Sequence, residues 1–419
     1  MCENQNTGIT RRGLITGGLG AAAAAAVVGA GGVLSGCTTG SADGSTVDLT
    51  SSIPFYDQKH PAGIHTPHHQ RHVTFLTFDM AEGTTKDDLK QLLATWSAAA
   101  ATMMQGKTLG KIEGNHGHGM TKENGEALDL GPSSLSITFG FGPSLFDERF
   151  GLEEFKPKQL EPLPRIVSDP VDIKNVDADF SIQICADDKQ VIFHALRHLA
   201  RLARPTANIR FSQSGFMPTT ATTEKNPPAP RNLFGFKDGT RNVSSDEDFE
   251  EFVWLNNADQ AWMEGGTYQV FRRMYMDIET WDADDIADQQ TIFGRFKESG
   301  APLTGTHEYD DPDYDAVDEN GEKVIAWNSH GALLSYENNG FRILRRPFNY
   351  ADGFTETGKH DAGLAFFFYM NDMEHWIELR QKMGKHDLMN EYVRDTHSGI
   401  WAIPKAPAKG HFIGEEFFA

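Results

Sequence analysis

The pattern that most constrains the fold occurs twice along the chain: an apolar strand runs directly into an aspartate and then into a helix. Residues 180–187 read FSIQICAD and lead into a helix at 189–202 with one apolar face. Residues 364–372 read LAFFFYMND and lead into a helix at 372–383. Further strands flank both copies. This duplication predicts an α+β fold of two ferredoxin-like (βαββαβ) domains, in which a helical layer covers one face of each antiparallel sheet.

The remaining predicted elements complete the two halves. They are strands at 72–80, 135–141, 208–213, 267–278, 341–346 and 400–403, and helices at 85–104 and 283–296. At 419 residues the chain is too long for one ordinary core, which favours two domains. We expect an N-terminal domain at 55–225 and a C-terminal domain at 226–419. The space between the two halves is the expected place for a large ligand.

Composition limits the class of partner. A hydrophobic content of 39% with 11% aromatic residues is typical of a folded globular protein. The formal net charge is −21. A surface this acidic repels phosphate backbones, so we expect no nucleic-acid partner.

Residues 1–36 are typical of an export signal. Arg11 and Arg12 form a twin-arginine start, and a run rich in glycine and alanine follows. Residues 34–37 read LSGC, which is similar to a lipobox whose cysteine, Cys37, is lipidated and becomes the mature N-terminus. An uncleaved transmembrane anchor is the alternative. Alanine and glycine partition poorly into lipid, which favours cleavage.

A lipidated Cys37 has consequences for the rest of the chain. We expect export by the twin-arginine route to an extracytoplasmic, lipid-anchored position, with residues 37–54 as a flexible tether rich in Gly, Ser and Thr. Cys2 is lost with the signal, so Cys185 is left alone and no intramolecular disulfide can form. Cys185 lies in an apolar strand pattern, which predicts a core residue rather than a catalytic thiolate.

Five histidines gather in residues 60–72, and they allow two interpretations. A metal site is one, because imidazole is a common metal ligand. Pro61 and Pro67 break the segment, however, so no helical pairing of ligands can be assumed. We favour a loop that packs on the body of the protein.

An acidic residue between two glycines is the first candidate for chemistry. Gly235 and Gly239 flank a turn that presents Asp238, and they let a flat ligand approach the main chain. An ordinary Asp-Gly surface turn is the alternative. His330 follows a short apolar run, and Arg345 ends a strand; a core histidine and a paired arginine are their ordinary interpretations. Together, an acid on a glycine turn, a histidine and an arginine suggest a peroxidase haem pocket.

These residues belong to motifs that resemble those of the dye-decolorising peroxidase family. The resemblance covers residues 55–405 and is greatest to the twin-arginine-exported, deferrochelatase-like branch, which is associated with iron uptake. GFKDGT at 235–240 resembles the family's signature. The other matching segments are HPAGI at 60–64 with TP at 66–67, LGP at 130–132 with TFGFG at 138–142, SH at 329–330 and ILRR at 343–346.

The resemblance implies a haem b peroxidase that uses hydrogen peroxide to oxidise dyes or other one-electron donors. Its two ferredoxin-like domains would enclose the haem pocket with their antiparallel sheets. His330 would be the proximal ligand of the haem iron. Asp238 would be the distal acid–base residue, and Arg345 the distal arginine.

The resemblance also implies contacts around these three residues. Gly239, Thr240 and Arg241 would touch the haem directly after Asp238. Glu391 would accept the other ring N–H of His330, which would make the imidazole more electron-donating. The family's usual propionate-anchoring arginine is missing at its expected place. The candidates to replace it are Arg241, Arg342 and Arg346.

A binding protein is the rival class of function. The acidic surface, the histidine-rich segment and the lipid tether would all suit a haem- or iron-handling component of an iron-uptake system, with uptake partners and with peroxidase activity only incidental. Turnover with peroxide and a dye distinguishes the two. A relative that has lost its haem is a third alternative, which the absorption spectrum decides. A homo-oligomer is a further expectation.

Overall fold

The computed structural model describes residues 47–112, 121–217 and 229–419. The fold belongs to the compact unit Gly44–Ala419. The twin-arginine pair and Cys37 lie outside the described residues, so the export signal stays a prediction. Within the described ranges, no helix is both long enough and apolar enough to cross a membrane.

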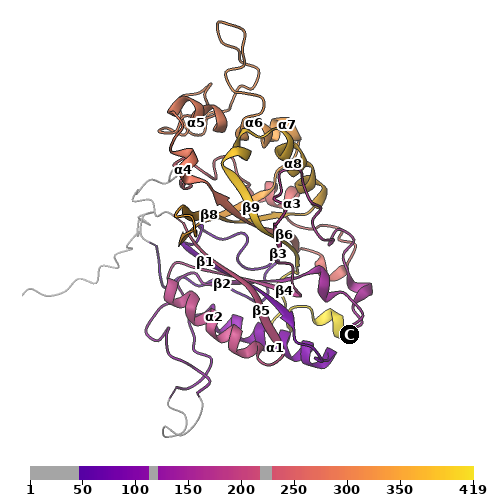
Figure 1. Cartoon of the computed structure of the whole chain (residues 1–419). Coiled ribbons are helices and arrows are strands. Elements are labelled where there is room, and N and C mark those ends of the chain that lie inside the picture. Colours follow the sequence, from indigo (N-terminus) through magenta and orange to yellow (C-terminus); the bar gives the residue numbers. More distant parts are fainter. Residues whose placement is uncertain (1–46, 113–120, 218–228) are drawn as a thin grey trace, which may run out of the picture. The chain divides into compact units, whose positions relative to one another are not determined.

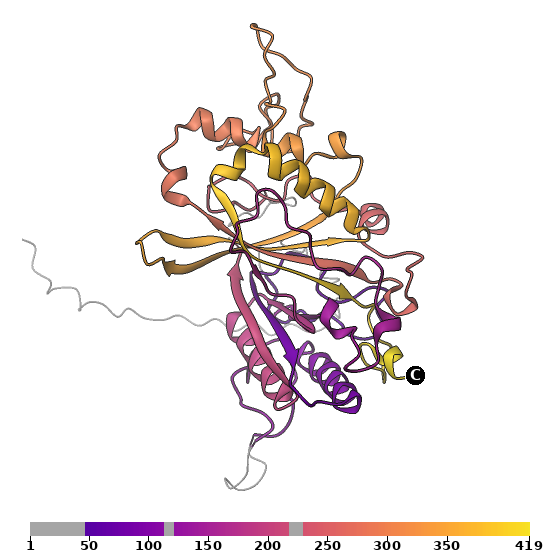
Figure 2. The same ribbon diagram turned by 45° about the vertical axis from the view of Figure 1, so that its right-hand side comes forward.

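The first half is built around a four-stranded antiparallel sheet. Its strands are β1 (His72–Met80), β2 (Ser136–Phe141), β4 (Phe180–Ala186) and β5 (Ala207–Phe216), in the order β2-β4-β1-β5. Helices α1 (Lys86–Met103) and α2 (Lys189–Ala203) cover its outer face (Figures 1 and 2). Each begins at a capping residue, because the side chains of Thr85 and Asp188 accept backbone N–H groups of the first turn.

The second half repeats this plan with a second antiparallel sheet. Its strands are β6 (Thr267–Met276), β7 (Leu344–Phe354), β8 (His360–Met370) and β9 (Val393–Ile403), in the order β7-β8-β6-β9. Helix α8 (Met373–His386) lies over its outer face (Figure 2). The short helices of this half are α3 (Asp246–Phe252), α4 (Ile278–Trp281), α5 (Ile286–Phe293), α6 (His330–Leu333) and α7 (Tyr336–Asn339).

Two single residue pairs join the sheets. Phe216 of β5 pairs with Asn349 of β7, and Phe141 of β2 pairs with Ala402 of β9. A short strand, β3 (Lys174–Asn175), adds in parallel to β9. The long strands therefore form a closed arrangement of two similar sheets. This topology confirms the prediction of an α+β fold with duplicated ferredoxin-like halves.

Two strands extend beyond the apolar runs that predicted them. β7 continues through Pro347 to Phe354. Proline is tolerated there because β7 is nearly an edge strand on the side of β5, where only one residue pair forms. β9 begins at Val393 rather than within 400–403. Its early part includes Asp395, whose carboxylate is buried in ion pairs, so a hydrophobic pattern could not predict it.

Side chains fill the space between the two sheets. The ring of Phe75 lies 4.6 Å from that of Phe271, 5.2 Å from Phe367 and 5.3 Å from Trp401, measured between centroids. All four side chains are buried. Cys185 belongs to the same cluster, which confirms the prediction that it is a core residue. The expectation that a large ligand lies between the halves is wrong, because core residues occupy this space.

The predicted tether ends earlier than residue 54. The carbonyl oxygen of Leu49 accepts the N–H of Ser133 at 2.9 Å, and that of Ser51 accepts the N–H of Ser134 at 2.8 Å. These bonds fix this part of the chain to the body of the protein.

The histidine-rich segment at 60–72 packs on the body, as expected. His60 stacks on Trp254 with a centroid separation of 4.1 Å. His68 contacts the carboxylate of Asp187 through Nε2 at 2.7 Å. Among the described residues, no three of these five histidines bring ligand atoms to one point, so the alternative of a metal site in this segment has no support.

Candidate active site

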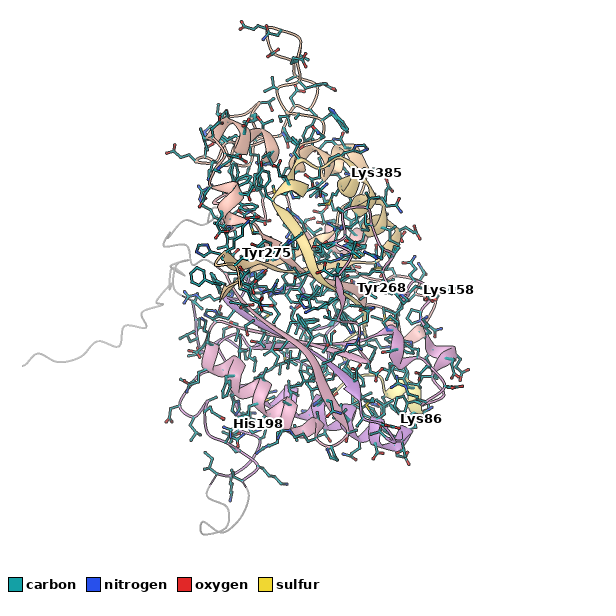
Figure 3. All side chains as sticks on the ribbon, viewed as in Figure 1. Lys86, Lys158, His198, Tyr268, Tyr275 and Lys385 are labelled. Atoms are coloured by element: carbon teal, nitrogen blue, oxygen red, sulfur yellow. The ribbon has the colours of Figure 1, made fainter. Side chains whose placement is uncertain are left out.

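A cavity opens over the outer face of the C-terminal sheet, where helix α8 lies across strands β6 and β8. Its empty space is about 1790 Å³ when the open solvent at its mouth is included. Figure 3 labels Lys385 on α8 and Tyr275 on β6, the helix and strand between which it lies. Apart from Ser168, every lining residue falls between Asn232 and Asp395. The site therefore belongs to the second half of the chain.

The floor of the cavity is apolar because strand residues alternate between two faces. In β8, Phe366 and Phe368 line the cavity, while the intervening Phe367 packs in the core between the sheets. The floor is formed by Met274, Met276, Leu364, Phe366 and Phe368.

His330 is the first residue of α6, directly after the capping residue Ser329. Its Nδ1 lies 2.8 Å from Oδ2 of Asp387, whose side chain is fully buried. The other oxygen of Asp387 accepts the N–H of Met389 at 2.9 Å. The carboxylate is thus fixed, it orients the imidazole, and it leaves Nε2 as the ring atom available to a ligand in the cavity.

The prediction that Glu391 accepts this ring N–H is wrong. Glu391 is exposed and makes no contact with His330. Asp387, four residues earlier, ends α8 and caps the following turn with its side chain. The signal in the sequence is an aspartate directly after a helix, but the helix end could not be placed within one turn from the apolar pattern alone.

Asp238 and Arg345 lie next to each other in the wall of the cavity. Nη1 of Arg345 lies 3.4 Å from Oδ1 of Asp238, and Nη2 lies 3.3 Å from the carbonyl oxygen of Thr240. Both side chains keep partial access to the cavity, with 26% of Arg345 and 15% of Asp238 exposed. The structure therefore brings together the acid and the arginine that are 107 residues apart in sequence.

Asn242 joins the Asp238 loop to strand β7. Its amide nitrogen donates to the carbonyl oxygen of Arg345 at 2.7 Å, and its amide oxygen accepts the N–H of Arg345 at 3.0 Å. The loop turns at Gly239, whose φ of +113° other residues rarely adopt. Sequence reasoning did not assign a role to Asn242, although it lies in the same motif.

Glu308 holds the same loop from the other side. This glutamate is buried. One carboxylate oxygen accepts the hydroxyl of Thr240 at 3.1 Å and the N–H of Ala229 at 3.0 Å, and the other pairs with Lys237. It went unnoticed in the sequence because it lies in a long acidic segment, where no local pattern distinguishes it from its neighbours; in the structure most of the other acidic residues of the segment are exposed.

The arginines proposed to bind a haem propionate fall into two groups. Arg241 and Arg342 line the cavity, where they pair with Asp311 at 2.6 Å and Asp248 at 2.7 Å. Arg346 faces away from the cavity and bonds to residues of the first half, including Gln70. Arg241 and Arg342 therefore remain as candidates, and Arg295, which the sequence did not single out, also lines the cavity.

The cavity fits a haem. It offers one imidazole nitrogen whose partner nitrogen is held by a carboxylate, which is a common arrangement for a histidine that ligates iron. Its apolar floor suits the porphyrin ring, and the two arginines suit the carboxylates at the ring's edge. Gly239, Thr240 and Arg241 line the cavity together, so the structure places all the predicted contact residues at the same site.

This fold and this set of side chains define a haem-dependent peroxidase. The chain belongs to the Dyp-type peroxidase family. The family's N-terminal domain model matches residues 61–217, and its C-terminal domain model matches residues 229–408. Together they span both halves of the fold.

Individual relatives agree with this assignment. The deferrochelatase of Escherichia coli is 36% identical over 372 residues, covering 86% of this chain and 86% of the relative. DtpA from Streptomyces lividans, solved as an oxyferrous complex, has a TM-score of 0.82 at 35% identity, covering 88% of this chain and 98% of DtpA. A DyP-type peroxidase from Streptomyces coelicolor has a TM-score of 0.80 at 35% identity, covering 89% and 97%. The family resemblance and the fold expected from the sequence are thereby confirmed.

Proposed function

We propose that this peroxidase uses Asp238, Arg345 and His330 to reduce hydrogen peroxide and to oxidise dyes or other one-electron donors. The observation that carries the proposal is their convergence: residues from a loop, a strand and a short helix line one cavity. Asp238 and Arg345 are in contact there. Among the described residues, His330 supplies the one imidazole of the cavity lining.

Each residue has a distinct task. When bound, the haem supplies the iron and the porphyrin that carry the oxidising equivalents. Asp238 takes a proton from one oxygen of hydrogen peroxide and returns it to the other, which leaves as water. The guanidinium of Arg345 stabilises the negative charge that develops as the O–O bond breaks. Asp387 holds Nδ1 of His330, which leaves the lone pair of Nε2 free, so that His330 would ligate the iron of a bound haem.

The replacement Asp238→Asn tests this assignment. We expect the haem spectrum to be kept and the reaction with peroxide to slow by roughly 10²–10⁴-fold, which is typical for the loss of a general base. Stopped-flow absorption of the haem band measures the rate. The control is Asp318→Asn, which changes an exposed aspartate of the acidic segment and should react like the wild type. An Asp238→Asn variant as fast as the wild type would assign the proton step to Arg345 or water.

Iron or haem handling is the second candidate function, and the deferrochelatase relatives favour it. In that case the protein would release iron from haem and leave an intact porphyrin. Incubation with haem and an iron chelator, followed by chromatography of the pigments, measures this. Accumulating metal-free porphyrin supports the iron role, whereas dye turnover without it supports the peroxidase alone. Partners from an iron-uptake system belong to this second candidate.

We place the activity outside the cytoplasm, with the protein bound to the membrane by a lipid on Cys37. The support is the sequence of residues 1–37, with its twin arginines and its LSGC segment. Twin-arginine export carries folded proteins, which suits a protein that is loaded with haem before it leaves the cytoplasm.

A further inference from the structure

A second group of ligand side chains lies in the first half of the chain, which contributes only Ser168 to the haem cavity. Glu123, Glu126, His194 and His198 each bring one ligand atom within 4.8 Å of all the others. The two histidines lie one turn apart on α2, on the outer side of the N-terminal sheet, where Figure 3 labels His198. Both carboxylates come from the connection that precedes β2.

The two imidazoles converge on a single oxygen atom. Nε2 of His194 lies 2.9 Å from Oε1 of Glu123, and Nε2 of His198 lies 3.2 Å from the same oxygen. The side chains of Glu123 and His198 are fully buried, and that of His194 is 5% exposed. Buried residues of this kind are normally paired or bound to a metal.

Glu126 supplies an independent observation. Its Oε1 pairs with Arg197, but its Oε2 is buried and has no hydrogen-bond partner among the described residues. A buried carboxylate oxygen without a partner costs free energy. A cation within the group would remove this cost.

Ordinary loop packing explains part of the arrangement. Glu123 accepts the N–H groups of Leu109 at 2.9 Å and of Asn124 and Gly125 at 2.8 Å, so it organises the local turn. Those bonds account for one buried carboxylate. They do not account for two imidazoles on one of its oxygens, nor for the unpaired oxygen of Glu126.

We propose that Glu123, Glu126, His194 and His198 bind a divalent transition-metal ion, with Zn²⁺ as the best fit. Four-coordinate sites with imidazole and carboxylate ligands are typical of zinc, whose ligand atoms at about 2.0–2.2 Å lie roughly 3.3 Å from one another in a tetrahedron. The observed separations of 2.9 and 3.2 Å are hydrogen-bond lengths, so these ligand atoms would move slightly apart to hold the ion. With four protein ligands the site is closed, so its role is structural: it fixes the connection to α2.

The ring protons of the two histidines can be placed in a way that allows metal binding. Each Nε2 must lose its proton to bind the metal, and the proton of the neutral ring then lies on Nδ1. Nδ1 of His198 is now 3.1 Å from Nη2 of Arg201, a contact that metal binding breaks. Arg201 also donates to the carbonyl oxygens of Thr121 and Lys122, so its guanidinium stays satisfied when it turns from the ring.

Zinc affinity tests the proposal on the haem-loaded protein. The protein is treated with a chelator, dialysed and titrated with Zn²⁺ against a chromophoric competitor. We expect one zinc ion per chain in the wild type. His198→Gln should weaken binding by at least the roughly 10–100-fold that loss of an outer partner costs. His360→Gln is the matched control, because it removes an exposed histidine on β8 and should leave the affinity unchanged.

X-ray absorption at the zinc edge tests the ligands without interference from haem iron. We expect two imidazole nitrogens and carboxylate oxygens at about 2.0–2.2 Å. Because this measurement needs only the wild type, it decides the case even if His198→Gln fails to fold. The proposal is overturned if the wild type binds no zinc, if His198→Gln binds it equally well, or if the spectrum shows fewer than two imidazoles.

Discussion

Neighbouring residues in β7 face different environments, and this alternation separates their roles. Arg345 points into the cavity toward Asp238, whereas Arg346 points to the other side of the sheet and bonds to Gln70. The period of two along a strand determines this difference. A motif that contains both arginines cannot show it, because the sequence presents them as a pair. The same alternation excludes Arg346, so Arg241, Arg342 and Arg295 are left as the propionate candidates.

At the same scale, Asp387 holds the imidazole of His330, the proposed proximal ligand. Asp387→Asn replaces a carboxylate by a neutral amide, so the bond to Nδ1 weakens and His330 donates less electron density. We expect the reduction potential of the haem iron to rise and haem affinity to fall by roughly 10–100-fold. Spectroelectrochemical titration measures the potential. Glu391→Gln serves as the control and should change neither quantity; a larger effect from Glu391→Gln than from Asp387→Asn would contradict the structure.

His397 makes stability depend on pH. Burial, followed by the positive charges of Arg273 and Lys174, lowers the pKa of His397 to about 4. An unfolded histidine has a pKa of about 6.5. As the pH falls from 6.5 toward 4, the unfolded chain binds a proton that the folded chain does not, so this residue lowers stability progressively. Urea unfolding of wild type and His397→Gln at several pH values measures the effect. The variant should lose less stability than the wild type across this window; identical losses would show that other groups are responsible.

At the scale of elements, side chains rather than regular structure position the catalytic loop. Residues 235–242 form no helix or strand. Asn242 binds the loop to β7 through two hydrogen bonds to the backbone of Arg345, and Glu308 binds it to the acidic segment. The distance between Asp238 and Arg345 therefore depends on Asn242, a residue that touches no substrate.

Asn242→Ala tests this dependence. Two hydrogen bonds worth about 0.5–1.5 kcal/mol each are lost, so we expect kcat/KM for peroxide to fall by about tenfold, while the proximal side and the haem spectrum stay unchanged. Steady-state kinetics with varied peroxide measure the change. Asn320→Ala, on the exposed part of the acidic segment, is the matched control. Equal rates for the two variants would mean that Glu308 alone holds the loop.

At the scale of the whole molecule, the repeated pattern predicted the fold but not the place of the ligand. The apolar strands before Asp187 and Asp372 were sufficient to identify both halves. They do not show which half has room for a cofactor. The first sheet carries two long helices, α1 and α2, whereas the second carries α8 and only short helices where 283–296 predicted a longer one. The cavity lies in the half with the incomplete helical layer, and this depends on packing between distant segments.

The residues of the candidate site could be predicted to different degrees for the same reason. Asp238, His330 and Arg345 belong to motifs, so their types and neighbours identified them. Asp387 and Glu308 act through contacts with residues 57 and 68 or more positions away, and no local pattern distinguishes them from other acidic residues. Their roles can be assigned only from the contacts that they make in the folded structure.

Attachment to the membrane by a lipid on Cys37 is a proposal at the scale of the whole chain. A diacylated cysteine holds a protein stably on a bilayer because two acyl chains act together. We expect Arg11→Lys with Arg12→Lys to leave the precursor in the cytoplasm, since the export route reads the arginine pair. Cys37→Ala should release the exported protein from the membrane fraction, whereas Cys2→Ala should not, because that cysteine lies in the segment that we propose is removed. Cell fractionation with mass spectrometry of the mature N-terminus measures each outcome. A Cys37→Ala protein that stays in the membrane with residues 1–36 attached would show an uncleaved anchor instead of a lipid.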